Sequence, residues 1–410
     1  MSHTAQKNCF RLVATVALQG LLVGAVAYAV YEPSQLPDPS RRWSVELSAS
    51  AGYDDNIHSR SDGDPNKKSS ATAMLNPKFA LNIPLDQTFF GLRYNYQWIY
   101  YWDRIGDEDF DQNHVADFIF SHRFTPRLQL DINDNFRRAI SPELVEIIGG
   151  VPYIRQERGD YFYNNLSTAI TYNLTKVWTL TIANGWEYWS YDEAAAADQD
   201  RNVFSPGIGL NWLVNPATTL GIHYRAGLVD YDDPGPNDMK NSLSHTAYLF
   251  LSHLFNPQLS GQLSAGGTVS ETDDGQKSSS PYVAGSVTYR YAPNGYLSVG
   301  ASYFLYTSEQ YGYRTAETVA SFLQCNHGIT PKLIARCAVR FVYSEYGDPS
   351  FVVPPGLPKP TSDSWLVDVG LSYSLTRWFI IDANYSFVRG SGVGNDFDRN
   401  RVWGGFRLIY

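Results

Sequence analysis

The stretch from Phe89 to Trp102 alternates between two kinds of side chain. One set is apolar or aromatic and the other is mostly polar: Phe90, Leu92, Tyr94, Tyr96, Trp98, Tyr100 and Trp102 against Phe89, Gly91, Arg93, Asn95, Gln97, Ile99 and Tyr101. Because a β-strand points successive side chains to opposite faces, the stretch predicts a strand with one apolar face. About 9 to 11 tilted residues span the hydrocarbon of a membrane, and aromatic belts mark its two interfaces. The pattern is therefore typical of a strand that crosses a membrane.

The same alternation recurs from Trp43 to Tyr410, with short and long connections in turn. The short connections carry turn-forming residues: Pro84–Thr88, Thr125–Arg127, Leu174–Lys176, Asn215–Pro216, Asn256–Gln258, Ala292–Gly295, Thr330–Lys332 and Leu375–Arg377. Nine longer connections are polar, acidic or rich in Gly and Pro. Together they join 18 strands, or 16 if the weak segments near Asn202 and Thr318 are not strands. We predict an all-β fold, a transmembrane antiparallel up-and-down barrel with short periplasmic turns and long outer loops.

The first 29 residues have the features of a secretory signal peptide. Lys7 and Arg11 precede an apolar run from Leu12 to Val30, and a small-x-small triplet predicts cleavage after Ala29. A non-cleaved anchor helix is the alternative, because the run is long. Residues 30–42 are polar and rich in Pro, which predicts a short periplasmic arm before the barrel of residues 43–410.

The last strand carries a pattern that bears on assembly. Phe406, Leu408 and Tyr410 alternate on one face, and the chain ends on the aromatic residue. This resembles the C-terminal signal by which the barrel assembly machinery recognises outer-membrane barrels. We therefore expect a bacterial outer-membrane location, with membrane lipid and the assembly machinery as partners.

The composition narrows the class further. Aromatic residues make up 15% and charged residues only 18%, as expected of strands that carry interfacial aromatic side chains. A formal net charge of −9 argues against nucleic acid as a partner, because nucleic-acid binding requires a basic surface. The histidines are scattered, and no GxSxG, HExxH or CxxC motif occurs. We expect neither enzymatic activity nor a cofactor.

The first strand ends in GYDDNI, residues Gly52 to Ile57. Together with the Leu-Thr turns that precede Trp178 and Trp378 and the aromatic-terminal strand, this stretch resembles a β-barrel porin family of the outer membrane. The resemblance covers residues 43–410. Members of that family often accompany exopolysaccharide secretion systems. The resemblance therefore implies an exit channel for the polymer, with polysaccharide and periplasmic export components as partners.

Charged residues fall mainly on the polar face of the predicted strands. If the apolar face is outward, these side chains point into the lumen: Arg93, Arg123, Arg137, Arg225, Arg290, Arg336, Arg340, Arg401 and Arg407, with Glu46, Asp117, Asp131, Glu187, Asp368 and Asp382. Lumen-facing side chains set selectivity, and Arg offers planar donors to carboxylate or hydroxyl groups. The basic excess favours anionic or sugar-like solutes. The alternative is that these charges pair across the inner wall and only stiffen the barrel.

Aromatic–acid pairs recur at the predicted outer rim. They are Tyr53-Asp54-Asp55, Tyr101-Trp102-Asp103, Tyr191-Asp192-Glu193 and Tyr231-Asp232-Asp233. Among these acids, Asp54, Asp55, Asp232 and Asp233 are candidate ligands of Ca²⁺ or Mg²⁺, which prefer oxygen donors. The simpler interpretation, solvated loop ends, is preferred.

Two cysteines follow the signal segment. Cys325 and Cys337 lie at equal distances from Pro331, so a hairpin would place them opposite each other. Opposed positions lie within disulfide reach, and an oxidising periplasm would allow the bond. The alternative is a pair of small apolar residues that face lipid.

Three functions fit the sequence. The principal one is an outer-membrane channel that is the exit for a secreted exopolysaccharide. The alternatives are a general diffusion porin for small solutes and a surface barrel without transport. Two long loops bear on this choice, because Ala139–Asp160 contains the apolar patch Leu144 to Ile148 and Glu345–Asp363 is rich in Pro. Either loop could fold into the lumen as a constriction, or the apolar patch could pack on a neighbour.

Overall fold

The computed structural model describes residues 41–104, 109–140, 160–192, 199–233, 240–308, 313–349, 359–392 and 396–410, together with the backbone of three strands outside these ranges. The predicted signal segment and arm therefore lie almost entirely outside the described residues. No helix in the described part of the chain is long and apolar enough to span a membrane.

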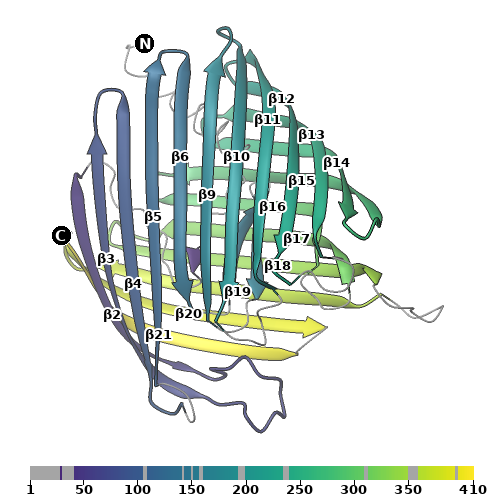
Figure 1. The fold of residues 1–410 in the computed structure, drawn as a ribbon. Helices are drawn as coiled ribbons and strands as arrows, with labels where there is room; N and C mark the ends of the chain where they lie inside the picture. The colour runs from purple at the N-terminus through teal and green to yellow at the C-terminus, as the bar shows by residue number, and fades with distance from the viewer. Residues whose placement is uncertain are drawn as a thin grey trace.

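Eighteen of the strands form one closed barrel. They are β2 (Trp43–Asp54), β3 (Ser70–Pro84), β4 (Thr88–Tyr101), β5 (Phe110–Thr125), β6 (Leu128–Ala139), β9 (Tyr161–Asn173), β10 (Trp178–Tyr191), β11 (Arg201–Asn215), β12 (Thr218–Tyr231), β13 (Ser242–Asn256), β14 (Leu259–Thr272), β15 (Lys277–Ala292), β16 (Gly295–Thr307), β17 (Tyr313–Gly328), β18 (Leu333–Pro349), β19 (Thr361–Ser374), β20 (Phe379–Gly392) and β21 (Phe397–Ile409). All neighbours pair antiparallel, and β21 pairs with β2 to close the ring (Figure 1). The predicted 18-stranded barrel is confirmed, because the two weak segments form β11 and β17.

The alternation of side chains sorts them between the two sides of the wall. On β13, Leu243, Leu249 and Phe255 are exposed on the outside, whereas Tyr248 and Phe250 are buried on the inside. The outer face carries aromatic residues at the short-turn end, where the rings of Trp178 and Trp212 stack with their centroids 5.8 Å apart. A wall with an apolar outer face and aromatic residues near its edge matches a barrel that lies in lipid.

A repeated hydrogen-bond pattern explains the short turns. In the turn after β5, the Thr125 hydroxyl accepts hydrogen bonds from the backbone N–H of Arg127 at 3.2 Å and of Leu128 at 3.1 Å. Thr175, Asn256, Thr330 and Thr376 accept two backbone N–H groups in the same way. These Thr and Asn residues satisfy the backbone donors that a tight turn leaves unpaired.

The connection between β6 and β9 forms a hairpin of its own. Strands β7 (Glu143–Ile148) and β8 (Val151–Gln156) pair with each other, and β7 also pairs with β1 (Tyr28–Ala29). Since β1 covers the last two residues before the predicted cleavage position, a processed chain would keep only β7 and β8. The hairpin contains the apolar patch of the loop Ala139–Asp160.

This hairpin reaches the far side of the barrel. Strand β8 contacts β15, β16, β17 and β18. In the ring, β17 is the ninth strand from β6 in both directions, so it lies diametrically opposite the strand that leads into the hairpin. The hairpin therefore crosses the barrel from one wall to the other.

Candidate solute pathway through the barrel

The predicted lumen charges all occupy inward positions of their strands. On β18, Arg336 and Arg340 share the inward face with the buried Val342, and on β21 Arg401 and Arg407 are themselves buried on that face. The same alternation directs Lys78 and Arg399 inward, although neither is among the predicted lumen residues. The signal for both was available, because they occupy inward positions of β3 and β21.

Part of this charge forms a network across the seam of the barrel, the place where β21 pairs with β2 and closes the ring. Arg407 donates to both oxygens of Asp382 at 3.1 Å, and its Nη1 lies 3.9 Å from Glu46. Glu46 also pairs with Lys78 at 3.5 Å, and the Ser372 hydroxyl donates to Asp382 at 2.5 Å. Here the predicted cross-pairing of charges on the inner wall takes place.

Two further arginines have partners on neighbouring strands. Arg340 donates to Asp368 at 3.0 Å, and Arg401 donates to the Ser386 hydroxyl at 3.2 Å. Asp368 thus compensates Arg340, whose side chain is largely buried. These contacts tie β18 to β19 and β21 to β20.

Other predicted arginines are not compensated. Among the described residues, Arg225, Arg290 and Arg336 form neither an ion pair nor a hydrogen bond, and the Nη2 atom of Arg336 is buried without a partner. On this wall, Asp382 could serve as an acid partner of Arg336, but Arg407 already binds both of its oxygens. These three arginines therefore face the inside of the barrel without an acid bound to them in the described part of the chain.

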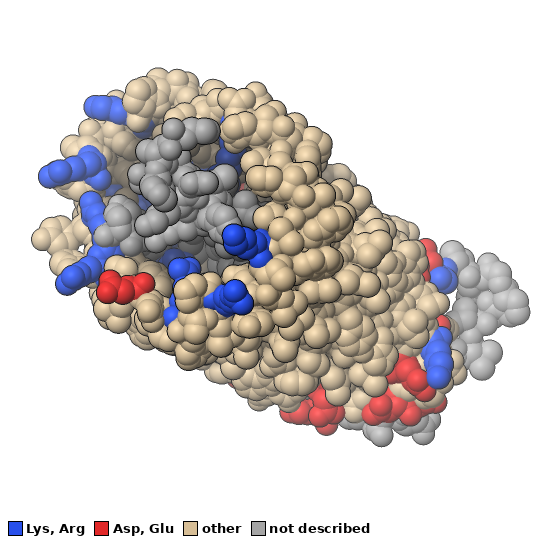
Figure 2. Space-filling view, turned by 90° about the horizontal axis from the view of Figure 1, so that it is seen from above, with Lys and Arg blue, Asp and Glu red and all other residues tan. Residues whose placement is uncertain are grey.

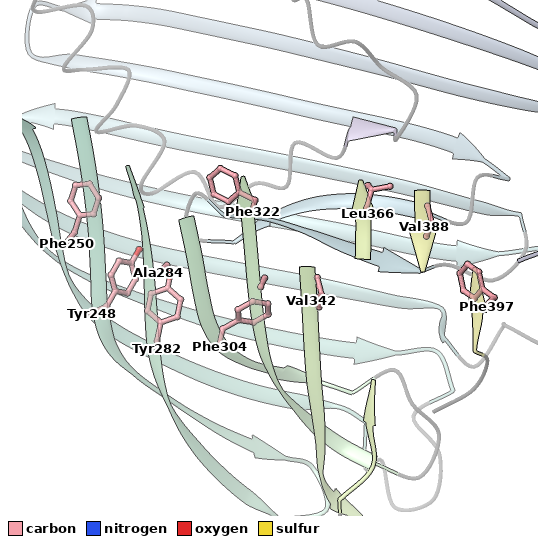
Figure 3. Close-up of a cluster of buried hydrophobic side chains, with 11 residues drawn as sticks. Tyr248, Phe250, Tyr282, Ala284, Phe304, Phe322, Val342, Leu366, Val388 and Phe397 are labelled. Atoms are coloured by element: carbon pink, nitrogen blue, oxygen red, sulfur yellow. The ribbon is translucent and has the colours of Figure 1, made fainter. Parts of the chain in front are cut away.

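An apolar band covers another part of the inner wall. It is formed by buried side chains of β13 and β15 to β21: Tyr248, Phe250, Tyr282, Ala284, Phe304, Ala320, Phe322, Val342, Leu366, Val388 and Phe397 (Figure 3). The strands that β8 contacts, β15 to β18, contribute Tyr282, Phe304, Phe322 and Val342 to this band. Apolar side chains would be poorly placed against open water, and the crossing hairpin lies against the part of the band on β15 to β18. The loop Ala139–Asp160 thus takes the first of its two predicted courses, into the lumen.

An aromatic group lies on the opposite inner wall near the long-loop end. Tyr161, Tyr163 and Trp189 are completely buried, and the rings of Tyr163 and Trp189 lie 4.2 Å apart. The guanidinium group of Arg201 lies over Trp189 and Tyr231, at 5.0 and 5.6 Å from the ring centroids. This arrangement holds β9, β10, β11 and β12 together where the hairpin leaves the wall.

The acids of the predicted outer rim have different neighbours. Asp54 accepts hydrogen bonds from Arg399, and the side chain and backbone N–H of Asn400 donate to Asp55 at 2.8 and 2.6 Å. Asp232 and Asp233 follow β12, nearly opposite β2 in the ring, so the two pairs cannot share one ion. No cluster of metal-ligating side chains occurs in the described ranges.

The two ends of the barrel differ in charge. Four of the short turns contain a basic residue, Arg127, Lys176, Lys332 or Arg377, whereas most acids of the connections lie in the long loops. Viewed from the short-turn end, Lys and Arg side chains surround the opening, and acidic side chains gather toward the other end (Figure 2). Basic side chains thus predominate over acidic ones at the short-turn mouth.

The remaining predicted residues lie on the outer face. Cys325 and Cys337 are directly opposed on β17 and β18, and both thiols are free in this structure. Phe406 and Tyr410 are exposed on the outside together with Leu408, and their assembly role stays a prediction. Five histidines also face outward, and each shares a hydrogen bond with a Tyr or Thr hydroxyl of another strand: His114, His122, His245, His253 and His327.

Comparison with known proteins adds little to this description. No protein-family profile matches the chain, and no curated protein matches it. Among solved structures, the chain is similar to OccAB4 of Acinetobacter baumannii, at 12% identity over 92% of this chain and 100% of the other, with a TM-score of 0.45. It is also similar to OpdK of Pseudomonas aeruginosa with vanillate, at 14% identity over 90% of this chain and 99% of the other, with a TM-score of 0.45. For OccK2 (OpdF) of the same species with glucuronate, the identity is 12% over 89% of this chain and 97% of the other, with a TM-score of 0.49. Similarity at this level does not extend to solute or mechanism.

Proposed function

We propose that this chain forms a channel in the outer membrane of a Gram-negative bacterium and that small solutes, preferentially anions, pass through it. The observation that carries the proposal is the sorting of side chains in a closed barrel. Exposed apolar side chains lie outside, and charged ones lie inside. Lipid can cover such an exterior, and a barrel of 16 to 18 strands is wide enough for an aqueous interior.

The preference for anions rests on the arginines that have no acid partner. Arg225, Arg290 and Arg336 lie on the inner face and form no ion pair with the described residues. Charge of one sign in a channel with low-dielectric walls raises the local concentration of the opposite ion. The basic residues at the short-turn mouth act in the same direction.

The crossing hairpin favours small solutes over a polymer. A hairpin that joins opposite walls narrows the cross-section of the barrel, and its strand β8 is held against β15 to β18. An extended polysaccharide would require it to move away. The exit of an exopolysaccharide, which the sequence analysis placed first, therefore becomes the alternative, and the small-solute channel is the function that we favour.

Planar-bilayer recordings of the purified protein test the proposal. We expect steady openings and a reversal potential in a salt gradient that indicates anion preference. Arg336→Ala should shift the reversal potential toward cations, because it removes an uncompensated positive charge from the lumen. Arg389→Ala is the matched control, since Arg389 faces outward and pairs with Asp398 at 3.8 Å.

Four results would count against parts of the proposal. Absence of any conductance would remove the channel, and an unchanged reversal potential in Arg336→Ala would remove the role of this arginine. A variant in which a short Gly-Ser linker replaces residues 141–158 should conduct more than the native protein; equal conductance would show that the hairpin does not narrow the path. Block of the native openings by sugar oligomers would support the polysaccharide alternative instead.

A further inference from the structure

Asp134 occupies an unusual position on the outer face of the barrel. It is the seventh residue of β6, and its neighbours across the strands are Phe118 of β5 and Leu166 of β9. The inward residues of β6, among them Asn135 and Arg137, are buried, so the carboxylate of Asp134 points toward lipid. Six strand residues at a tilt of about 40° rise about 15 Å, which is inside an apolar band about 25 Å tall.

No other outward Asp, Glu, Lys or Arg of the described strands lies so deep. Each of the others is at least the eleventh residue of its strand when counted from the short-turn end: Arg138, Asp230, Glu271, Lys277, Glu317, Glu345, Asp363, Arg389 and Asp398. These positions reach the polar interface, where a charge is well tolerated. Asp134 is four residues closer to the short-turn end than the nearest of them, Arg138 on the same strand.

A second polar group lies at the same depth on β10. Asn184 is the seventh residue of β10 and faces outward beside Thr168 of β9. Its Oδ1 atom is buried without a hydrogen-bond partner, and its amide donates to none of the described residues. A buried polar atom without a partner is unfavourable, because inside a membrane no water can replace the missing bond.

The carboxylate of Asp134 is only partly satisfied. Asn164 of β9 donates to its Oδ1 at 2.8 Å, and the other oxygen has no partner among the described residues. The outer face of β6, β9 and β10 thus offers one free acceptor on β6 and one free amide on β10. Strand β9 lies midway between these two strands.

The acceptor on β6 and the amide on β10 allow this face to pair with the same face of a second copy. Two copies with the same orientation in a membrane are related by an axis along the membrane normal, and a two-fold contact brings residue i against j and j against i. If the axis passes along β9, then β6 of one copy faces β10 of the other. Residues at equal depth meet, so the Asp134 carboxylate lies opposite the Asn184 amide on both sides of the axis.

We propose that β6, β9 and β10 form a two-fold interface with a second copy of this chain in the membrane, in which Asp134 of each copy accepts a hydrogen bond from Asn184 of the other. The aromatic side chains just above the polar groups, Phe136, Phe162 and Tyr188, extend the same face, with ring centroids 5.1 and 5.7 Å apart. They supply apolar contact area next to the polar pair. The interface requires only that the barrel lies in a membrane, whatever solute passes through it.

Cysteine cross-linking of the full-length protein in outer-membrane lipid tests the position of the axis. In a background with Cys9→Ser, Cys325→Ser and Cys337→Ser, Leu166→Cys on β9 should form a covalent dimer on mild oxidation. Val339→Cys is the matched control, because it faces outward at similar depth on β18, opposite β9 in the ring. Equal cross-linking at both positions, or none at Leu166→Cys, would overturn the proposal.

Sedimentation of the same protein in detergent tests the polar pair. Loss of two symmetric hydrogen bonds between membrane-embedded groups should raise the dissociation constant of the dimer about tenfold in Asp134→Leu. Ile132→Leu, one outward position away on the same strand, should leave it unchanged. A monomeric native protein, or an Asp134→Leu protein that associates as tightly as the native one, would contradict the proposal and leave lipid as the occupant of this face.

Discussion

At the scale of single residues, an inward position does not determine what a charge does. Arg336 and Arg340 share one face of β18, yet only Arg340 pairs with an acid, at 3.0 Å from Asp368. The acid that could serve Arg336, Asp382, is bound by Arg407 from the far end of the chain. Alternation predicts which way each side chain points, but competition for an acid depends on the three-dimensional neighbours. The pairing of charges across the inner wall is therefore observed for Arg340 and Arg407, whereas a role of Arg336 in selectivity stays a prediction.

A residue at the long-loop end gives a prediction about pH. Burial would raise the pKa of Asp274, but hydrogen bonds from Arg314 and Thr272 outweigh it and keep the pKa below its usual 3.8. Arg314 donates to Asp274 at 2.7 Å and also to the backbone carbonyls of Asp348 and Pro349, so it joins the β14–β15 turn to β18. A carboxyl with a lowered pKa in the folded state stabilises the fold above its unfolded pKa, and this stabilisation is lost as the pH falls through its folded pKa.

We therefore expect Asp274→Asn to lower the free energy of unfolding by about 1 kcal/mol at neutral pH. The difference from the native protein should shrink as the pH falls below about 4. Thermal unfolding in detergent micelles, followed by circular dichroism, measures both. Asp273→Asn is the control, because that side chain forms no hydrogen bond or ion pair with the described residues. A difference that stays constant down to pH 3 would show that the ion pair is not its cause.

At the scale of elements, the short turns repeat one local solution. A Thr or Asn at the start of the turn accepts the backbone N–H groups of the second and third residues after it. The residue directly after it needs no N–H, so a proline is compatible there, as after Thr125, Thr330 and Asn256. These turns could be predicted because their chemistry is contained in three or four consecutive residues. The path of the β7–β8 hairpin could not, because its contacts lie on strands more than a hundred residues away.

The turn chemistry predicts a clear contrast between two threonines. Thr125→Ala should lower the stability of the barrel by about 1 kcal/mol, since it removes the acceptor of two backbone donors. Thr171→Ala should have no such effect, because the Thr171 hydroxyl is buried without a hydrogen-bond partner in the described structure. Urea unfolding in lipid vesicles measures both variants. Equal stability of the two would mean that water satisfies the turn as well as Thr125 does.

At the scale of the whole molecule, the strand count followed from the sequence because each strand has one apolar face and each connection is plainly short or long.

The closure of the ring depends on both ends of the chain together. Val45 and Tyr410 exchange backbone hydrogen bonds at 3.1 and 2.8 Å, and the rings of Trp43 and Tyr410 lie 5.2 Å apart. At the other end of the seam, Asp54 binds Arg399 and Asn56 donates to the carbonyl of Asp398 at 2.9 Å. The GYDDN stretch thus binds the first strand of the barrel, β2, to the last, β21, at this end.

The seam also requires the two backbones to approach closely, and this gives a test of closure. A Cβ atom at Gly405 of β21 would lie 2.6 Å from the Cα of Ser50 on β2, which is closer than real side chains tolerate. The adjacent Gly404 has room, since its Cβ would meet nothing nearer than the Asp382 carbonyl at 3.8 Å. We expect Gly405→Ala to cost about 1–3 kcal/mol, as overpacking typically does, and Gly404→Ala to be neutral.

The temperature at which the folded barrel opens in SDS, read from its shift in gel mobility, measures this cost. Gly405→Ala should open at a lower temperature than the native protein and Gly404→Ala at the same temperature. Since both residues lie on β21 and differ only in the face that they occupy, a general loss of strand propensity would affect them alike. Equal opening temperatures for the two variants would therefore mean that the β2–β21 contact does not limit the stability of the barrel. In that case the crossing hairpin and the charge network of Glu46, Asp382 and Arg407 would have to hold the ring closed.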